Sequence, residues 1–515
     1  MQYLPASAFF LLICSFVLGA GAALLFSFGQ KKAAIVNLVL ASGVIAYVFA
    51  SVDPFLHPWD EQFHALVSKN LMHHPFKPTL YDQPVLPYDY TVWWSNHIWL
   101  HKQPLFLWQM AISQSIFGVN EIGVRFPDVI LHALLTFLIF DLGRMFKNER
   151  VGFFAAFIFT FLNFPLELIS GNVELDHNDV SFTFYVTASF WALFKFRAKG
   201  NFAWVYVIGV FSGCAILVKW LPGLLVYLSW GILHISENLK HRTFFKNLKP
   251  LFVSFLTALA VALPWQIYCF ITFPAEFKHE MQYNSMHLTQ AVEGHTGDWS
   301  FHFAALSRLY GEGGAVPFLL LAGLIYALLD KKIGAANKTI FIVSIIFVYA
   351  FYSIVATKML AFPLIVLPLV VILLANLLVF LIDLLKNKLA RNIVFACLCA
   401  ACGFLFLDLN RFLKSHTLFY KMEENNERYK DILEAKAMRE LKNQTDSNSV
   451  LFNTGPLNLQ MMFFTDATAY SSIPSAEECQ TIKQMGRRII VLDQGGLPDP
   501  IARDSSIVKI PFPKY

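Results

Sequence analysis

The sequence has 515 residues, of which 56% are hydrophobic and only 15% are charged, and its mean hydropathy is +0.53. Soluble domains carry charge on roughly a quarter of their residues, so this composition excludes an ordinary soluble protein and indicates a polytopic α-helical membrane protein. The net charge is only +5, and most basic residues stand in short loops. We interpret them as membrane-topology signals and expect no nucleic-acid partner.

Apolar runs that approach the roughly 20 residues needed to cross a bilayer as a helix recur along the chain. We predict spans near residues 7–28, 33–52, 127–146, 151–168, 180–195, 202–218, 223–235, 250–272, 315–330, 339–356, 360–384 and 392–410. Lys and Arg cluster in every second connecting loop, which puts these loops in the cytoplasm. The segments 53–126, 169–179 and 273–314 then face outward. Residues 104–118 begin and end outside, so we predict a helix lying in the outer interface there.

The tail differs from the rest of the chain in its composition. Residues 423–442 are densely charged and predict an amphipathic helix. The strand-like runs SVLF (449–452), RRIIVLD (487–493) and SIVKI (506–510), with a helical stretch at 475–486, predict a small α/β unit. We therefore divide the chain into a multi-span domain, 1–410, and a small soluble α/β domain, 411–515, on the outward face. The tail contains no glycine-rich phosphate loop, and we assign it no chemistry.

The first outward loop carries the adjacent acids Asp60 and Glu61, directly after Pro58-Trp59. Two neighbouring carboxylates just beyond a membrane span are costly near lipid, which makes them candidates for a functional site. The alternative is a solvated helix N-terminus, because acids in a first turn interact favourably with the helix dipole.

The second outward loop carries Asp176 and Asp179 at the mouth of a span. Their spacing of three puts both side chains on one face of a helical turn, where they could form an acidic site. The alternative is a hydrated loop that caps the following helix through Asn178 or Asp179.

Two lysines stand at the ends of predicted spans. Lys219 precedes a Pro222-Gly223 turn, so its side chain could point into a cavity, where a cation suits a lipid-linked phosphate. Lys358 could supply a second phosphate or sugar contact. For both lysines the alternative is snorkelling toward the membrane surface.

The outward segment 273–314 contains four His and four acidic residues. His and carboxylates together can hold a divalent metal, and His287 and His295, with Asp176 from the preceding loop, are the candidate ligands. The alternative is a hydrogen-bonded loop, because the spacing matches no metal-binding motif.

Several short motifs, in this order, resemble the GT-C class of lipid-sugar-dependent glycosyltransferases, and most closely its protein O-mannosyltransferase and aminoarabinose transferase (ArnT-like) members. The motifs are WDEQ (59–62), HKQPLFLW (101–108), FGVNEIGVRFPD (117–128), DLGRMF (141–146), LDHNDVSF (175–182), LVKWLPGLL (217–225) and TKMLAFPLIVLP (357–368). They cover most of the membrane part. The chain departs from the usual pattern at Gln103, where Pro is usual, and at Phe362, where Tyr is frequent.

The resemblance implies transfer of a hexosyl or pentosyl group, with inversion, from a polyprenyl-phosphate donor to an unidentified acceptor hydroxyl. It implies Asp60 as general base, with Glu61 orienting or stabilising the site. Cations for the donor phosphate would come from Lys102, Arg125, Lys219 and Lys358. Asp176 or Asp179 would bind the acceptor or share a metal. We expect the protein in a bacterial inner membrane, with its active site and tail on the periplasmic side.

Two other function classes remain open from the sequence. A transporter or flippase for a lipid-linked or small anionic substrate would use the same Lys and Asp residues as a pathway, but the hydropathy shows no inverted repeat. A membrane scaffold that presents the tail would leave the acidic and lysine motifs without a purpose.

Overall fold

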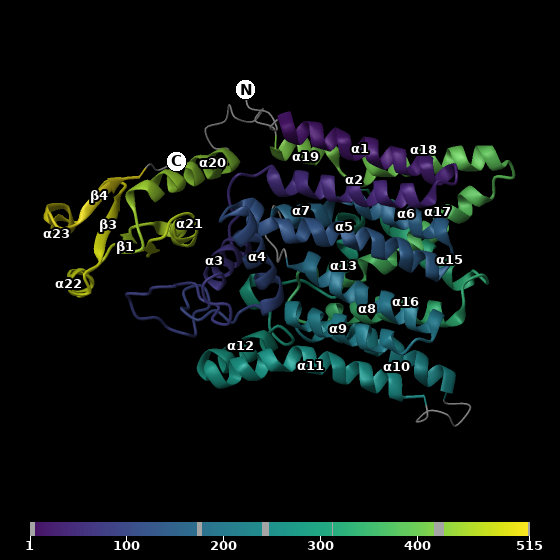
Figure 1. The fold of residues 1–515 in the computed structure, drawn as a ribbon, viewed down its shortest axis with the longest axis horizontal. Helices are drawn as coiled ribbons and strands as arrows, with labels where there is room; N and C mark the ends of the chain where they lie inside the picture. Colours follow the sequence, from purple (N-terminus) through teal and green to yellow (C-terminus); the bar gives the residue numbers. More distant parts are fainter. Residues whose placement is uncertain (1–5, 172–177, 239–246, 312, 417–426, 513–515) are drawn as a thin grey trace.

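The structure is a computed structural model that describes residues 6–171, 178–238, 247–311, 313–416 and 427–512. Long helices lie alongside one another in a bundle, and a small sheet-containing domain stands at one end of it (Figure 1). This arrangement confirms the predicted class, a polytopic helical membrane protein with a small C-terminal α/β domain.

Seven described helices are long and apolar enough to cross a membrane, counting α17 with the η4 turn before it. They are α1 (Ala6–Ser27), α2 (Lys31–Ser51), α5 (Glu121–Phe146), α11 (Lys249–Thr272), α16 (Ala335–Ile354), α17 (Leu367–Asp383) and α18 (Lys388–Phe406). An eighth forms if α6 (Glu149–Thr160) and α7 (Asn163–Ser170), which meet at a 44° bend, count as one broken span.

These are fewer helices than the twelve predicted spans, but the comparison rests on length and composition alone, so the number of spans stays a prediction. Two predicted spans, 202–218 and 315–330, form within one residue of their predicted bounds as apolar helices of 17 and 14 residues, α9 (Ala203–Lys219) and α15 (Val316–Leu329). The α9 helix ends at Lys219, and Pro222 and Gly223 form the 3-10 turn η1 (Leu221–Leu224) before α10 (Leu225–Asn238) begins. Lys219, a candidate site residue, therefore stands at the helix terminus.

The remaining elements of the membrane part connect these helices. They are α3 (Asp60–Leu71), α4 (Pro104–Phe117), α8 (Asp179–Lys199), α12 (Pro274–Met286), η3 (Val292–Gly294), α13 (Phe301–Ala304), α14 (Leu306–Tyr310), η4 (Phe362–Val366) and α19 (Leu409–His416). The predicted helix at 104–118 forms as α4. It buries Phe106, Leu107 and Met110 and exposes Ile112 and Ile116, the two-sided character that an interfacial helix needs.

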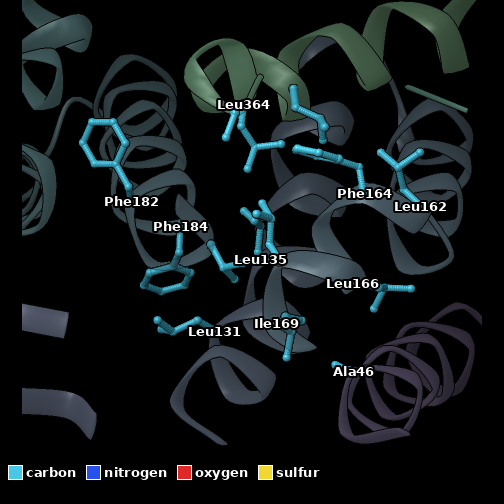
Figure 2. Close-up of a cluster of buried hydrophobic side chains, with 14 of the residues drawn as sticks. Ala46, Leu131, Leu135, Leu162, Phe164, Leu166, Ile169, Phe182, Phe184 and Leu364 are labelled. Atoms are coloured by element: carbon cyan, nitrogen blue, oxygen red, sulfur yellow. The ribbon is translucent and has the colours of Figure 1, made fainter. Parts of the chain in front are cut away.

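A cluster of large apolar side chains holds the helices behind the outward loops together. Leu135 of α5, Phe164 and Ile169 of α7, Phe182 of α8 and Leu364 of η4 belong to it (Figure 2). Within a membrane such contacts stabilise by close packing, because lipid is as apolar as the side chains. The bent α6–α7 pair and α8 are thereby fixed against α5.

The tail domain is a four-stranded parallel sheet in the order β2-β1-β3-β4. Its elements are α20 (Glu427–Leu441), η6 (Lys442–Gln444), β1 (Ser449–Phe452), η7 (Gly455–Leu457), α21 (Asn458–Phe464), β2 (Thr468–Ala469), α22 (Ala476–Gln484), β3 (Arg488–Asp493), α23 (Asp499–Arg503) and β4 (Val508–Pro511). The β1 strand occupies the residues predicted for it. The two-residue β2 strand and α21 are additional, because neither has a hydrophobic run long enough to signal it.

The first outward loop lies between the bundle and the tail domain (Figure 1). The Lys69 ammonium donates to the carbonyls of Met462 and Thr465, at 2.8 and 2.5 Å, which are orphan acceptors at the end of α21. The Tyr470 hydroxyl accepts from the backbone N–H groups of Val85 and Leu86 at 3.0 and 3.1 Å. The loop and the tail therefore form one continuous wall.

Candidate active site

A cavity of about 1860 Å³ opens between the first outward loop, the bundle and the tail domain. Small-molecule pockets usually measure about 300–1,000 Å³, so this one could hold more than a single sugar. Asp60, Lys102, Lys219, His287 and His295 all line it. Sequence segments more than two hundred residues apart thus converge on one space, and five of the predicted site residues face it.

Asp60 is the first residue of α3 and lies on the cavity wall. Its carboxylate is one-fifth exposed, and Lys102 Nζ lies 3.5 Å from Oδ1. The preceding Trp59 has φ 63° and ψ −127°, a backbone conformation that is costly for any residue with a Cβ. The strained Trp59 turns the chain so that Asp60 reaches the cavity from the start of the helix.

Glu61 lies behind the wall, in contrast to its neighbour. Its side chain is buried, and Arg125 binds it through two N–H groups, with Nε at 2.6 Å and Nη2 at 2.9 Å. The backbone N–H of His57 donates a further bond of 2.7 Å. Gly171, at φ 72°, packs against it so closely that a Cβ there would lie 2.7 Å from Oε2. Glu61 is therefore a fixed internal anchor.

Arg125 was predicted to bind the donor phosphate, but its guanidinium is fully engaged elsewhere. Besides Glu61 it donates to the backbone carbonyls of Ala50, Asp53 and Phe55 at 2.7–3.1 Å, and its side chain is fully buried. A buried arginine of this kind holds several chain segments in register. We therefore assign Arg125 to positioning the loop and leave it out of the donor site.

Lys219 pairs with Asp179 at the inner part of the site. Its Nζ lies 2.8 and 2.9 Å from the two carboxylate oxygens and 5.6 Å from the centre of the Phe362 ring. Trp220, directly after Lys219, has φ 62° and ψ −154°. Its backbone is therefore strained in the same way as that of Trp59, which precedes Asp60. The last side chain of α9 thus reaches the first residue of α8.

The second acidic motif is only partly described. Asp176 lies outside the described residues, so Asp179 is the acid whose position is known. Asn178, on the cavity wall, is 1% exposed, and its side chain makes no capping hydrogen bond to α8. Both of its side-chain polar atoms lack a hydrogen-bond partner among the described residues. The capping alternative therefore does not describe Asn178, which lines the cavity.

Lys358 was predicted to contact a phosphate or sugar, and the structure gives it a different role. Its ammonium donates to the carbonyls of Tyr352, Ser353 and Val355 at 2.6–2.8 Å. These are the last carbonyls of α16 and the residue after it, which have no partner within the helix. Lys358 is only 4% exposed, so it neither snorkels nor lines the cavity. It caps the helix that carries Tyr352.

Of the three predicted metal ligands, Asp176 lies outside the described residues, so the set as a whole stays a prediction. His287 and His295 both line the cavity, but the Nδ1 atom of His287 contacts the Thr357 hydroxyl at 3.1 Å. No group of three His, Cys, Asp or Glu side chains suited to a metal occurs among the described residues. The hydrogen-bonded loop that we considered as the alternative fits this geometry.

Sequence reasoning missed Tyr352, which lines the cavity beside the Lys219–Asp179 pair. Its ring stacks on Phe362 at 4.6 Å, and it lies close enough to Asp179 to interact electrostatically. Phe362 replaces the tyrosine that is frequent in the resembling proteins, so Tyr352 supplies a phenol in the same neighbourhood. The only signal in the sequence was its position six residues before Lys358.

Aromatic residues of the first outward loop form the outer wall. Tyr88 and His97 stack with ring centres 4.1 Å apart, and Tyr81 stacks on Tyr470 of the tail at 5.3 Å. Burial, with a smaller effect of Lys77, lowers the pKa of His97 to about 4, so its ring is neutral at physiological pH. The wall therefore presents flat, uncharged rings.

Comparison with known proteins supports the resemblance in the membrane part. The profile of the family described as dolichyl-phosphate-mannose-protein mannosyltransferase matches residues 101–268. The chain is 28% identical over 191 residues to an undecaprenyl phosphate-alpha-4-amino-4-deoxy-L-arabinose arabinosyl transferase of Pseudomonas fluorescens, covering 34% of this chain and 32% of that protein. A Proteus mirabilis protein of the same name is 34% identical over 164 residues, 31% of this chain and 28% of the relative. The matches thus span about a third of the relatives' length.

Solved structures resemble the whole fold. ArnT from Cupriavidus metallidurans, bound to undecaprenyl phosphate, aligns with a TM-score of 0.60 over 88% of both chains at 14% identity. The oligosaccharyltransferase AglB from Archaeoglobus fulgidus aligns with a TM-score of 0.52 over 87% of this chain and 65% of its own, at 12% identity. The profile match over residues 101–268 and these alignments show that the chain is similar to the mannosyltransferase family in that segment and shares the fold of ArnT and AglB.

Proposed function

We propose that the protein is an integral membrane glycosyltransferase that moves a hexosyl or pentosyl group from a polyprenyl-phosphate donor to an acceptor hydroxyl. One observation carries this proposal above the others. A carboxylate, Asp60, and two ammonium groups, Lys102 and Lys219, line one cavity that is large enough for a lipid-linked sugar. The arabinosyl transferases to which the chain is similar are named for an undecaprenyl phosphate-linked sugar, which supports a donor of this class.

The cavity has an apolar part suited to the lipid. It is lined by Leu221, Leu224 and Leu228, around η1 and α10, and by Phe347 and Phe351 of α16. These residues belong to the bundle, where the first isoprene units of a polyprenyl chain would enter from the membrane. Apolar walls beside two ammonium groups match a molecule with a hydrocarbon tail and an anionic head.

The two lysines would hold the donor phosphate. Each already neighbours a carboxylate, Asp60 for Lys102 and Asp179 for Lys219, so each is positioned without a donor present. A phosphate oxygen that develops negative charge as the sugar leaves would be stabilised by both ammonium groups. The Tyr352 hydroxyl, beside the Lys219–Asp179 pair, would donate a further hydrogen bond.

Asp60 would act as general base in a single displacement. Its carboxylate takes the proton of the acceptor hydroxyl while the acceptor oxygen bonds to C1 of the sugar. The bond between C1 and the phosphate oxygen breaks, and its electron pair leaves with the polyprenyl phosphate. Attack from the face opposite the leaving group inverts the configuration at C1. Glu61 and Arg125 would hold the start of α3 in place during the step.

We place the active site and the tail domain on the periplasmic side of a bacterial inner membrane. The supporting observation is the alternation of basic loops along the sequence, such as Lys31-Lys32 and the segment 144–150, with the outward loops that line the cavity. Cysteines introduced at Trp94 and at Lys386 would test this placement in intact cells. A membrane-impermeant maleimide should label the first and spare the second.

Donor turnover tests the function. Purified protein in liposomes would receive a panel of radiolabelled polyprenyl-phosphate sugars, with wild type beside Asp60→Asn and Lys219→Ala. Release of polyprenyl phosphate by wild type, lost in both folded variants, is the expected result. Movement of intact labelled lipid between leaflets without release would contradict the proposal and favour a flippase.

A further inference from the structure

The outer wall of the cavity comes from two parts of the chain that the proposed reaction does not use. The tail domain contributes Asp431 and Glu434 of α20, the segment 455–460 and the segment 470–472. The first outward loop contributes the aromatic residues between 81 and 97 on the facing side. In the proposed reaction the donor's lipid lies against the bundle and its phosphate near Lys102 and Lys219, so the outer slot is left for the acceptor.

Carboxylates outnumber ammonium groups among the described residues that line the cavity. Five carboxylates line the described part of the cavity, Asp60, Asp89, Glu293, Asp431 and Glu434, against two lysines, Lys102 and Lys219. Both lysines are next to carboxylates and lie where the donor phosphate would be held. An acceptor that carries phosphate or carboxylate groups would enter the slot against like charge.

The negative charge of Glu434 in the tail domain is partly compensated by Lys430, which lies outside the slot. Lys430 Nζ lies 3.7 Å from Glu434 Oε1, and Lys430 is not among the described residues that line the cavity. Burial raises the pKa of Glu434, and Lys430 acts in the opposite direction. The face that the tail presents to an acceptor therefore includes carboxylate oxygens, which accept hydrogen bonds from hydroxyl or ammonium groups.

The slot also offers flat apolar surfaces. Trp59, Tyr88 and Trp94 are 58%, 41% and 54% exposed and line the cavity. The opposite wall carries short side chains that both donate and accept hydrogen bonds, including Asn458, Gln460 and Ser471. A sugar ring matches this pairing, because its C–H faces pack on aromatic rings while its edge carries hydroxyls.

Building on the proposed function, we infer that the acceptor is a glycan without negative charge, either neutral or amino-bearing, bound between the Tyr88–Trp94 wall and the tail-domain acids. Its acceptor hydroxyl would then lie toward Asp60, which is on the same cavity wall as Trp59. The proposed acceptor is therefore neither an anionic lipid nor a peptide.

Calorimetric binding to the full-length protein in detergent tests the inference without donor. The probes are chitotetraose, its fully de-acetylated amine form, tetragalacturonic acid as the anionic match, and a serine-rich heptapeptide. We expect the neutral or the amine glycan to bind about tenfold or more tighter than the anionic one, a difference of about 1.4 kcal/mol. Equal or tighter binding of the anionic glycan, binding of the peptide alone, or binding of none would overturn the inference.

Variants locate the binding surface. Trp94→Ala should weaken glycan binding about tenfold, because one exposed stacking face is lost. Asp431→Asn with Glu434→Gln should remove the discrimination against the anionic probe and leave neutral binding nearly unchanged. Trp299→Ala is the matched control, since Trp299 is 71% exposed and lies elsewhere. Unchanged glycan binding in Trp94→Ala, together with full discrimination against the anionic probe in the double variant, would contradict this surface.

A second measurement keeps the two proposals apart. Release of polyprenyl phosphate to water needs the donor site alone, so it is measured on the wild type beside the glycan titration. Donor turnover without glycan binding would overturn the acceptor inference and leave the transferase proposal standing. Glycan binding without turnover of any donor would overturn the transferase proposal and leave the binding of a glycan standing.

Discussion

Arg428 of the tail domain forms an ion pair with Asp53 of the first outward loop, with Nε 2.7 Å from Oδ1, across 375 residues of sequence. The other carboxylate oxygen of Asp53 contacts His57 Nε2 at 3.2 Å, and the His57 backbone N–H donates to Glu61. A continuous series of contacts thus links the tail domain to the residue next to Asp60. The tail both covers the cavity and holds its acidic corner.

Arg428→Ala should therefore lower kcat strongly, while the protein stays folded. A displacement of the loop by about 1 Å can cost on the order of 100-fold in rate, and we expect a loss of that size in kcat. Arg503→Ala, which removes an exposed pair with Asp499, is the control and should leave kcat unchanged. Equal turnover in the two variants would show that the tail does not position the loop.

Substitutions at the two neighbouring acids should separate chemistry from folding. Asp60→Asn should reduce transfer by about 10²–10⁴-fold, the usual contribution of a general base, with little change in melting temperature. Glu61→Gln leaves the buried Arg125 without its counter-charge and should destabilise the protein by about 3–5 kcal/mol. Thermal unfolding in detergent and donor turnover, measured on both variants, would show the reverse pattern if the roles are exchanged.

The Lys219–Asp179 pair offers a rescue test. Lys219→Met leaves the buried Asp179 carboxylate uncompensated and should lower stability by about 3–5 kcal/mol. Adding Asp179→Asn removes that charge and should restore much of the melting temperature, while donor release stays low because the phosphate has lost its cation. Recovery of both properties in the double variant would assign the pair a structural role only.

The strained backbone at Trp59 predicts an unusual order of stability. At φ 63° a residue with a Cβ costs about 1–3 kcal/mol, which glycine avoids. Trp59→Gly should therefore melt at a higher temperature than Trp59→Ala, the opposite of the order expected in a helix. The same pair of substitutions at Lys436, an exposed interior position of α20, should show the opposite order, because glycine lowers helix stability relative to alanine.

Lys69, which joins α3 to the tail domain, gives a pH dependence. Burial, partly offset by Asp466, lowers the pKa of Lys69 from 10.5 to about 8. Between these two pH values the unfolded chain binds more protons than the folded chain, so stability rises with pH across this window and is lowest below about pH 8. The melting temperature of wild type minus that of Lys69→Gln should increase from about pH 7 to about pH 10. A constant difference would mean that Lys69 titrates as it does in the unfolded chain.

The sequence was sufficient for the elements whose signal is local. The β1 strand and the α22 helix follow from a short hydrophobic run and from a Ser475–Glu478 capping box. The order of the seven motifs was enough to predict the fold class, because it depends only on residue types and their positions along the chain.

Contacts between segments far apart in the sequence could not be predicted from local patterns. Arg125 and Lys358 have the charge that a phosphate needs, and only their burial and their carbonyl partners show that they are occupied. Glu61 and Arg125 lie 64 residues apart, and no pattern in one sequence pairs them. Tyr352 escaped notice because an aromatic residue within an apolar run carries no mark of facing a cavity.

The composite wall of the cavity has a consequence for how the protein is made. Asp60 leaves the ribosome early, whereas Asp431, Glu434 and Tyr470, which close the same cavity, are synthesised only after every long apolar helix. A nascent chain therefore holds its acidic corner open to water until the tail has been made and has docked onto Lys69 and Asp53. We therefore expect the cavity, and with it the proposed transfer, to be completed last during biogenesis.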